Sequence, residues 1–402
     1  MADAMRRRET FYRVAWLAVV LFLVIVFFVP SSLAKQPQIQ NKLLVTAIGL
    51  DETEDGVKLS CVAVMPTGKP DSSVTSLVVS HEGATIGECV SAISSIYGKD
   101  AELGLCGFVL LGDSVKGDVT EHLGYLLSSA RISPGTYLAV TDGADAEKIL
   151  SLAAREHPST AGIFSSIVEY NAKSADITTR TLLEFISAKH SPSALSVLPC
   201  VRLDEQKAAK AEQEVKEKSG ESVGEMPVED LTDSRIFING RRAFDLSSDE
   251  TVALNLTSRD LTDGLTALEK TVIDGEEIER TVSRIYSTSR QRRVYYDEDV
   301  PRVKTALKVK LELTDHRPTL RFAKKVGIDE HDAVSKLASK YAEKFKRDLE
   351  SLVERSKAEN ADIFLVSNDF YRFYPSRYNE DEQKGDFLSR LEYEFDVQVE
   401  FK

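Results

Sequence analysis

The sequence predicts a mixed α/β protein of more than one domain, preceded by a membrane-spanning helix. The chain has 402 residues, a length that suggests two or three domains. Segments with the two-residue period of strands alternate with segments that have the 3.6-residue period of helices. Near the N-terminus, an uncharged apolar run follows a cluster of arginines, which is typical of a membrane-targeting segment.

The bulk composition narrows the classes of partner. Hydrophobic residues make up 42% of the chain and charged residues 29%, a balance that supports packed cores rather than wholesale disorder. Acidic residues outnumber basic ones, and the formal net charge is −13. Because that charge repels a phosphate backbone, the sequence argues against nucleic acid as a partner.

The N-terminal segment is predicted to be a membrane anchor. Four arginines come first: Arg6, Arg7, Arg8 and Arg13. An apolar run without charge extends from Val14 to Val29 and is stopped by Pro30. Counted from Phe11, a helix of about 19 residues would be roughly 28 Å long, close to the hydrocarbon thickness of a bilayer. Because basic residues stay in the cytoplasm, everything after Pro30 is expected on the far side of the membrane.

Two other interpretations of this segment remain open. Ser32 and Ala34 supply the small-x-small pattern of a signal-peptidase site, so the segment could be a cleaved secretory signal that leaves Lys35 first. The apolar run is longer than the usual secretory core, which favours a retained anchor. A buried core helix is the third interpretation, but it does not explain the arginine cluster.

The first part of the remaining chain alternates strands with helices. The β-rich runs Leu43–Asp51 and Val57–Val64 flank a polar turn with a glycine and are predicted to form a hairpin. Ala84–Tyr97 has apolar residues at helical spacing, and Phe108–Gly112 is typical of a buried strand. A further strand and three further helices are expected at Tyr137–Val140 and at Val119–Ala130, Ala144–Ala154 and Ile177–Ala188.

A change of composition marks an insert in the middle of the chain. Between Leu203 and Asp233 the sequence is rich in Lys, Glu, Ala, Ser and Gly and has few large apolar side chains, so it is expected to be mobile. Docking of a partner by these charges is the less favoured interpretation. Order is expected to resume at Arg235–Phe244, where Asn239 and Gly240 lie between two apolar runs and predict a hairpin.

The C-terminal region has the clearest pattern. Apolar residues alternate with charged ones over Leu307–Leu313 and again over Leu391–Phe401, as in strands with one buried face. A long helix is predicted over His331–Lys357, with Asp329 as its N-cap. Its apolar stripe consists of Val334, Leu337, Tyr341, Phe345, Leu349 and Leu352. The last domain is therefore expected to be a long helix packed on an antiparallel sheet.

Sequence motifs of catalysis are missing. The chain has no phosphate-binding glycine loop, no GxSxG elbow and no HExxH pair. The histidines are scattered singly, and a lone histidine without a partner is more often a surface residue than a catalyst. They are His81, His122, His157, His190, His316 and His331. We therefore predict no catalytic and no cofactor-binding residues.

The four cysteines are widely spaced. They are Cys61, Cys89, Cys106 and Cys200. Because they include no CxxC pair and no histidine at zinc-ligand spacing, no metal site is predicted. Most of them lie among apolar residues, which favours small buried side chains, and a disulfide outside the cytoplasm remains the alternative.

Aromatic residues concentrate before the final strand. They are Phe364, Phe370, Tyr371, Phe373, Tyr374 and Tyr378. Such a cluster could bind a partner, because aromatic and arginine side chains dominate interface hot spots. The favoured interpretation is a loop that packs on its own domain through its rings.

Several segments, in this order, resemble the Ger(x)C family, the membrane-attached C subunits of nutrient germinant receptors in endospore-forming bacteria. Val45–Asp51 is similar to the opening strand of that family. A later section of the family has a G-x-T-I motif, then a helix, then a strand that ends in Gly. Glu82–Ile86 matches the motif, and Phe108–Gly112 matches the strand. Asn239–Phe244 resembles its G-x-A-V-F hairpin, and Ala361–Phe364 with the aromatic stretch resembles its C-terminal region.

The resemblance implies three consecutive mixed α/β domains and no catalytic activity, and no cofactor is predicted. It also implies assembly with polytopic membrane subunits at the spore inner membrane, in nutrient sensing or signal relay during germination. The domain limits expected on this basis are 1–36 for the basic tail and anchor, 37–145, 146–264 with the insert at 203–233, and 265–402. Contact with a small-molecule germinant is left open.

One feature departs from the family. Its members usually carry a lipidated cysteine as an anchor, whereas no cysteine occurs here before Cys61, so the apolar run is expected to hold the protein at the membrane. A stand-alone extracytoplasmic binding or scaffold protein that reuses the fold is therefore the alternative function. A surface hydrolase is disfavoured, because no partnered nucleophile is visible.

Overall fold

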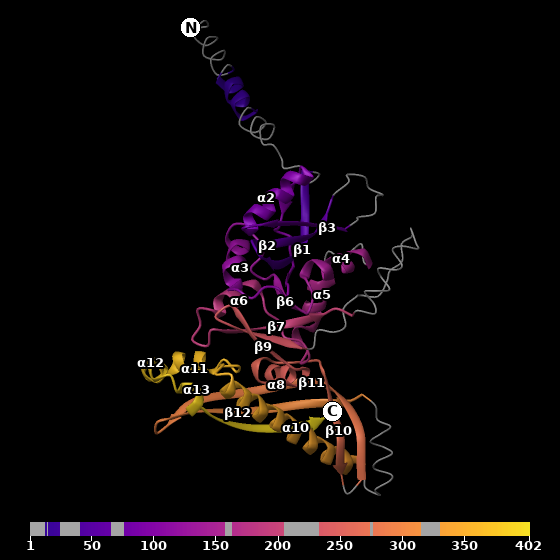
Figure 1. Cartoon of the computed structure of the whole chain (residues 1–402), viewed down its shortest axis with the longest axis vertical. Coiled ribbons are helices and arrows are strands. Elements are labelled where there is room, and N and C mark those ends of the chain that lie inside the picture. Colours follow the sequence, from indigo (N-terminus) through magenta and orange to yellow (C-terminus); the bar gives the residue numbers. More distant parts are fainter. Residues whose placement is uncertain are drawn as a thin grey trace, which may run out of the picture.

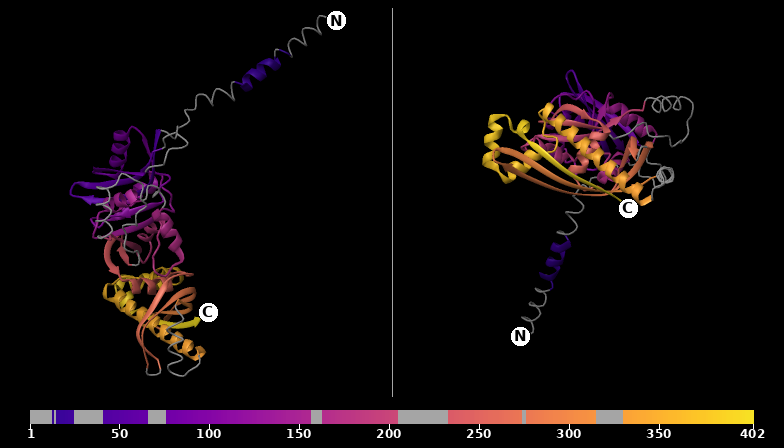
Figure 2. Two further views of the ribbon diagram at one scale, coloured as in Figure 1. Left: turned by 90° about the vertical axis from the view of Figure 1, so that its right-hand side faces the viewer. Right: turned by 90° about the horizontal axis from the view of Figure 1, so that it is seen from below.

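The computed structural model of this chain describes most of its residues. They are 13, 15–24, 41–65, 76–156, 163–204, 233–273, 276–314 and 330–402. Two β-sheets organise them. Figures 1 and 2 show the first sheet with its helices above the second sheet, which carries a long helix. The prediction of a mixed α/β fold is confirmed.

Part of the predicted anchor lies within the described residues. Residues 15–24 are helical, and large apolar side chains such as Trp16 and Phe22 are exposed there. The rest of the predicted span from Phe11 to Val29 lies outside the described residues, as does the candidate cleavage site. In the part of the chain that the structure describes, no helix is both long enough and apolar enough to cross a membrane.

The first sheet is mixed and has a parallel centre. Its strands are β1 (Lys42–Thr53), β2 (Gly56–Val64), β3 (Ser76–Gly83), β4 (Asp100–Glu102), β5 (Phe108–Leu111), β6 (Tyr137–Asp142), β7 (Leu195–Arg202), β8 (Ser234–Ile238) and β9 (Arg241–Leu246). Their order is β3-β2-β1-β5-β6-β7-β8-β9, and β4 pairs with β1. β1, β5, β6 and β7 are parallel, and both outer pairs of strands are antiparallel. The predicted first hairpin and the two predicted central strands are confirmed.

Helices cover both faces of this sheet. They are α2 (Ile86–Tyr97), α3 (Val119–Ser128) and α6 (Leu182–Ala188) on one face, and α4 (Ala146–Glu156) and α5 (Ile163–Tyr170) on the other. Side chains of β5 alternate between the two cores: Val109 packs with the first set and Leu110 with the second. Because a parallel strand is buried on both faces, its sequence is continuously apolar, as β5 is.

The helix predicted at 177–188 begins later than expected. α6 starts at Leu182, because Thr181 and Glu184 form a capping box in which each side chain accepts a hydrogen bond from the other's backbone N–H. Thr181 also forms a β-bridge with Tyr137. The residues before the cap are therefore held beside β6 instead of joining the helix.

The hairpin of β8 and β9 turns at Asn239 and Gly240, as predicted. Both residues have positive φ, 51° and 76°, which is the left-handed conformation that such a two-residue turn requires. The chain then enters α8 (Ser248–Ser258), where no helix was expected. Because the side chains of α8 are buried on almost every side, its sequence lacks the amphipathic period that reveals a surface helix.

The second sheet consists of four strands. They are β10 (Leu265–Ile273), β11 (Glu276–Asp297), β12 (Val300–Leu313) and β13 (Glu392–Phe401), in that order. The first three are antiparallel, but β13 runs parallel to β12. The expectation of a purely antiparallel sheet was therefore wrong at its last strand. A parallel neighbour requires a long crossover connection, which the helices between β12 and β13 supply.

The long helix α10 (Glu330–Ala358) covers this sheet as predicted. Tyr341, Phe345 and Leu349 of its apolar stripe are buried, and the Tyr341 hydroxyl donates a hydrogen bond of 2.9 Å to the Thr281 carbonyl. The predicted N-cap, Asp329, lies outside the described residues. Leu307, Val309 and Leu311 of β12 are buried, which confirms the predicted face of that strand.

The aromatic stretch is helical, so its interpretation as a loop was wrong. It forms α11 (Val366–Phe373) and α12 (Pro375–Lys384), followed by the short α13 (Phe387–Arg390). The carboxylate of Asp362 accepts hydrogen bonds from the first backbone N–H groups of α11, which explains why a helix begins there. Packing through the rings is confirmed for Phe370, which is buried. Its ring meets that of Tyr296 edge to face, with 5.2 Å between the ring centroids.

The predicted domain limits stay predictions. Strands on both sides of the limit at 145/146 belong to the first sheet, and the limit at 264/265 coincides with the start of the second. Residues 205–232, nearly all of the predicted insert, lie outside the described residues.

Candidate functional site

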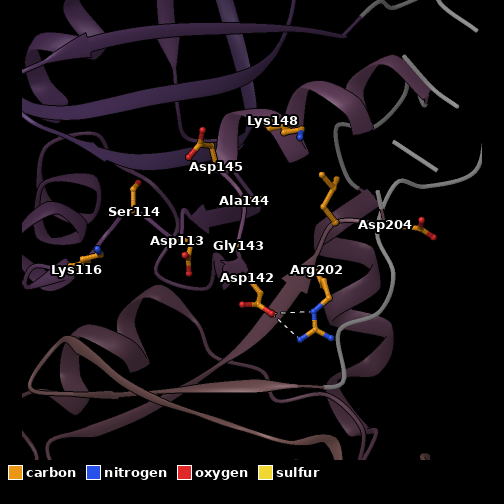
Figure 3. A pocket seen from close by; sticks show the side chains of 11 residues that line it. Asp113, Ser114, Lys116, Asp142, Gly143, Ala144, Asp145, Lys148, Arg202 and Asp204 are labelled. Atoms are coloured by element: carbon orange, nitrogen blue, oxygen red, sulfur yellow. Dashed lines mark hydrogen bonds and ion pairs between the residues drawn. The ribbon is translucent and has the colours of Figure 1, made fainter. Parts of the chain in front are cut away.

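A cavity of about 840 Å³ lies at the carboxyl edge of the parallel strands. Because parallel strands end at the same edge of a sheet, the residues that end or follow them come together there. Asp113 follows β5, Asp142 ends β6 and Arg202 ends β7. The other charged residues of the described lining are Lys116, Asp145, Lys148 and Asp204, which Figure 3 labels.

The wall of the cavity on the side of β6 and β7 is an ion-pair network. Figure 3 shows Asp142 and Arg202 pointing toward each other. Two guanidinium nitrogens of Arg202, Nε and Nη2, donate to Asp142 Oδ2 at 3.0 and 2.8 Å, and Nη2 also donates to Asp233 Oδ2 at 3.1 Å. The hydrogen bond from Arg202 lowers the pKa of the Asp142 carboxyl below its usual value. This aspartate is therefore ionised at neutral pH.

Arg235 links this edge to the β8–β9 hairpin. Its side chain is fully buried, and its guanidinium lies 3.0 Å from Asp113, 3.2 Å from Asp142 and 2.5 Å from Asp245. It also donates a 2.8 Å hydrogen bond to the Thr141 carbonyl. Burial alone would lower the pKa of Arg235, but the hydrogen bond and charge of Asp245, with Asp113, raise it. A buried arginine with this many anionic partners stays charged and fixes the hairpin against β6.

Asp51 at the end of β1 holds the neighbouring helix. Its two carboxylate oxygens accept hydrogen bonds from the backbone N–H groups of Ala146 at 2.8 Å and Glu147 at 3.1 Å, in the first turn of α4. Gly112 is required beside it, because a Cβ there would lie 1.8 Å from Asp51 Oδ1. Burial raises the pKa of Asp51 despite these hydrogen bonds.

The described lining of the cavity contains one hydroxyl side chain. It belongs to Ser114, whose Oγ accepts a hydrogen bond from the Glu52 N–H at 2.9 Å, and no histidine is among the described lining residues. A serine nucleophile needs an adjacent base, and no base is hydrogen-bonded to Ser114 within the described part of the chain. Among the residues that the structure describes, no group of three or more His, Cys, Asp or Glu side chains is arranged to hold a metal ion.

The segments of this site were predicted from the sequence, but its residues were not. Asp51 ends the family-like opening strand, and Gly112 ends the second family-like strand, yet neither received a role. Arg235 was missed because it lies in an apolar strand and two of its partners, Asp113 and Asp142, are distant in sequence. The available signal was a charged residue directly after or within each buried strand.

The residues considered earlier for chemistry do not meet here. All four cysteines are buried and free, which confirms their interpretation as small buried side chains over a disulfide. Burial raises the pKa of the Cys106 thiol to about 12, so it is not a reactive thiolate. Of the histidines, His81 lies on β3 and His122 on α3, whereas His157 and His316 lie outside the described residues.

Comparisons with known proteins identify the family. Residues 35–203 match the family described as "Spore germination protein N-terminal domain". Residues 232–402 match the family described as "Spore germination B3/ GerAC like, C-terminal". The two matches follow each other along the chain and leave between them only the predicted charged insert.

Among solved structures, one similar chain is titled "Crystal Structure of the GerBC protein". It is 15% identical, the match covers 88% of this chain and 96% of that chain, and the TM-score is 0.49. No curated protein matches this sequence. On the two consecutive family matches, this chain belongs to the GerAC family of spore germination proteins, the C subunits of germinant receptors.

Proposed function

We propose that this chain is a non-enzymatic, membrane-anchored subunit of a spore germinant receptor that acts in nutrient sensing or signal relay during germination. The observation that carries the proposal is the pair of consecutive matches to the two domains of one spore germination family. The chemistry of the described residues agrees with it, because the lining of the cavity at the carboxyl edge contains paired ions such as Asp142 and Arg202.

The proposed partners are polytopic membrane subunits of the receptor. The proposed location is the spore inner membrane, with a single N-terminal span and the bulk of the chain extracytoplasmic. The arginine cluster and the apolar run from Val14 to Val29 support this orientation. The ion pairs of Arg235 hold the β8–β9 hairpin against the ends of β5 and β6.

Deletion of the coding region in the native sporulating host tests the function. Loss or slowing of nutrient-triggered germination, measured as the fall in optical density of spore suspensions and restored by the wild-type chain, is expected. Normal germination with every nutrient tried would contradict the proposal. Co-purification from spore membranes separates the alternative, because a stand-alone scaffold protein would not bring polytopic receptor subunits with it.

A second experiment tests the anchor separately. A retained span predicts that the native protein begins near Met1 and stays with spore membranes through high-salt washing. A cleaved signal predicts an N-terminus at Lys35 and release into the wash. The second outcome would remove the anchor and leave the receptor function in place.

A further inference from the structure

A second cavity, of about 460 Å³, lies between the two sheets. Its walls come from β6, β7 and the segment before α6 on one side, and from α8, β11 and residues 363–365 on the other. Figure 1 shows α8 between β9 and the second sheet. Val197, Leu254 and Phe364 are buried side chains of its apolar lining. The volume is in the range of sites for small molecules.

Four arginines line this cavity. They are Arg180, Arg259, Arg290 and Arg292. Within the described ranges, no carboxylate lies within 4.0 Å of a side-chain nitrogen of the first three, and Arg292 lies 3.4 Å from Asp369. Such a cluster is unexpected in a chain with a net charge of −13, because acidic residues are abundant enough to pair with every arginine.

The guanidinium of Arg259 is fixed by the backbone instead of by an acid. Nη1 donates to the Ala172 carbonyl at 2.9 Å and to Thr179 Oγ1 at 2.7 Å. Nη2 donates to the Ser174 carbonyl at 2.9 Å and to the Ile177 carbonyl. Its Nε is buried and has no hydrogen-bond partner in the described part of the chain. The orientation of this cation is set, but its charge is not neutralised.

The neighbouring acids compensate the positive charge only in part, by attraction of Glu184 on Arg180 and of Asp260 and Asp369 on Arg290. Glu184 is the carboxylate in the lining, and its Oε2 already accepts hydrogen bonds from the N–H and the hydroxyl of Thr181. Arg290 and Arg292 both donate to the Thr257 carbonyl near the end of α8. Carbonyl dipoles stabilise these cations only in part, because each carries a fraction of a charge.

Burial and mutual repulsion act against the charged forms. Burial, with a contribution from the nearby Arg180, lowers the pKa of Arg259 to about 10. Burial also lowers the pKa of Arg180 and of Arg290. These guanidinium groups remain protonated at neutral pH at a cost in free energy, and an anion placed among them would remove that cost.

We propose that this cavity binds a small anionic molecule whose carboxylate or phosphate group lies between Arg180 and Arg259 and whose apolar part packs against Leu254 and Phe364. Arginine suits this role, because its planar fork matches both oxyanions. The proposal goes beyond the receptor function and does not depend on it.

A neighbouring open cavity of about 740 Å³ supports the same charge preference. It shares Arg290 and Arg292 with the proposed site and adds Arg293 and Arg372, against a single acid, Asp369. A surface lined by one sign of charge concentrates the opposite ion near it. An anion therefore approaches the site along an arginine-lined surface.

Calorimetric titration of the purified full-length chain in detergent tests the proposal. The probes are 3-phenylpropionate, 2-phenylethylphosphonate and the neutral 3-phenylpropionamide, which share the phenylethyl group and differ in the head group. Saturable binding of at least one anion is expected, with the neutral amide at least about tenfold weaker. The stronger anion identifies the head group. Binding of neither anion, or equal binding of the amide, would overturn the proposal.

A matched pair of variants locates the binding. Arg180→Gln is expected to lower the affinity for the anion at least about tenfold, which corresponds to about 1.4 kcal/mol of binding free energy. Arg280→Gln removes the same charge from β11 at an exposed position whose partner, Glu269, is 3.9 Å away, and it should leave the affinity unchanged. Equal weakening in both variants would mean non-specific attraction and overturn the site. If Arg180→Gln does not fold, Arg290→Gln replaces it in the comparison.

Discussion

Two groups of arginines in this chain have opposite surroundings. At the carboxyl edge of the first sheet, the guanidinium groups of Arg202 and Arg235 each contact two or more aspartates. In the cavity between the sheets, Arg180 and Arg259 have no described carboxylate within ion-pair distance. The residue type is the same, so the two groups differ only in the side chains that surround each guanidinium. Paired arginines join elements, whereas unpaired ones leave charge available for a ligand.

The largest effect is expected at the paired group. Arg235→Met should lower the free energy of unfolding by about 3–5 kcal/mol, because it leaves the carboxylates of Asp113, Asp142 and Asp245 together without their shared cation. The urea midpoint of the full-length chain in detergent measures it. Arg241→Met, at an exposed position of β9, is the control and should change stability by about 0.5 kcal/mol or less. Equal losses in both variants would remove the structural role of Arg235.

A smaller loss is expected at the unpaired group. Arg259→Met should cost about 1–3 kcal/mol, because backbone carbonyls lose their donors while a charge without a counterion disappears as well. The same urea titration gives the value. A loss as large as that of Arg235→Met would show that pairing with acids does not govern the stability of buried arginines here.

Acid should weaken the paired group. Since the pKa of Asp142 is lowered in the folded chain, its contribution is present above the ordinary value of 3.8 and is lost as the pH falls through the lowered folded pKa. The free energy of unfolding should therefore fall less steeply below about pH 4 in Asp142→Asn than in the wild type. The difference should be about 1 kcal/mol or less. The measurement is the urea midpoint against pH.

The pKa shift of Asp51 is opposite in sign to that of Asp142, so Asp51 serves as the control for the acid experiment. Its pKa is raised by burial, so protonation near its folded pKa favours the folded chain. Asp51→Asn removes this stabilisation by protonation, so the free energy of unfolding should fall more steeply with decreasing pH than in the wild type. A flattening in both variants would contradict the assignment of the two pKa directions.

The smallest effect is expected for Arg180→Gln without ligand. Its thermal midpoint should match or slightly exceed that of the wild type, a change within about 0.5 kcal/mol, because the substitution relieves repulsion from Arg259. A clear destabilisation would mean that Arg180 is structural and would weaken the contrast between the two groups. The measurement is a thermal unfolding scan of both proteins at low salt.

Local patterns predicted much of the fold. The apolar stripe of α10 and the alternation in β12 are repeated over many residues, so the period alone identified both elements. The Asn239-Gly240 turn was predicted for the same local reason. Where neighbours in space decided the structure, prediction failed: β13 pairs in parallel, α8 has no clear period, and Asp362 starts a helix in the aromatic stretch.

The candidate site was predicted far less well than the fold. Its side chains come from the ends of separate strands, and Arg235 lies 122 residues from Asp113 and 93 from Asp142. No pattern within a segment records such a pairing. The charged residues that follow buried strands were visible in the sequence, but only the parallel order of β1, β5, β6 and β7 places them at one edge.

By itself, the sequence determined the mixed α/β class, many of the helices and strands, and the resemblance to a spore germination family. These depend on hydrophobic periods and short motifs, which are properties of neighbouring residues. Only the tertiary structure decided which arginines face aspartates and which face a cavity. Electrostatic surroundings depend on distances of a few ångströms between residues that are far apart in the chain, and folding alone sets those distances.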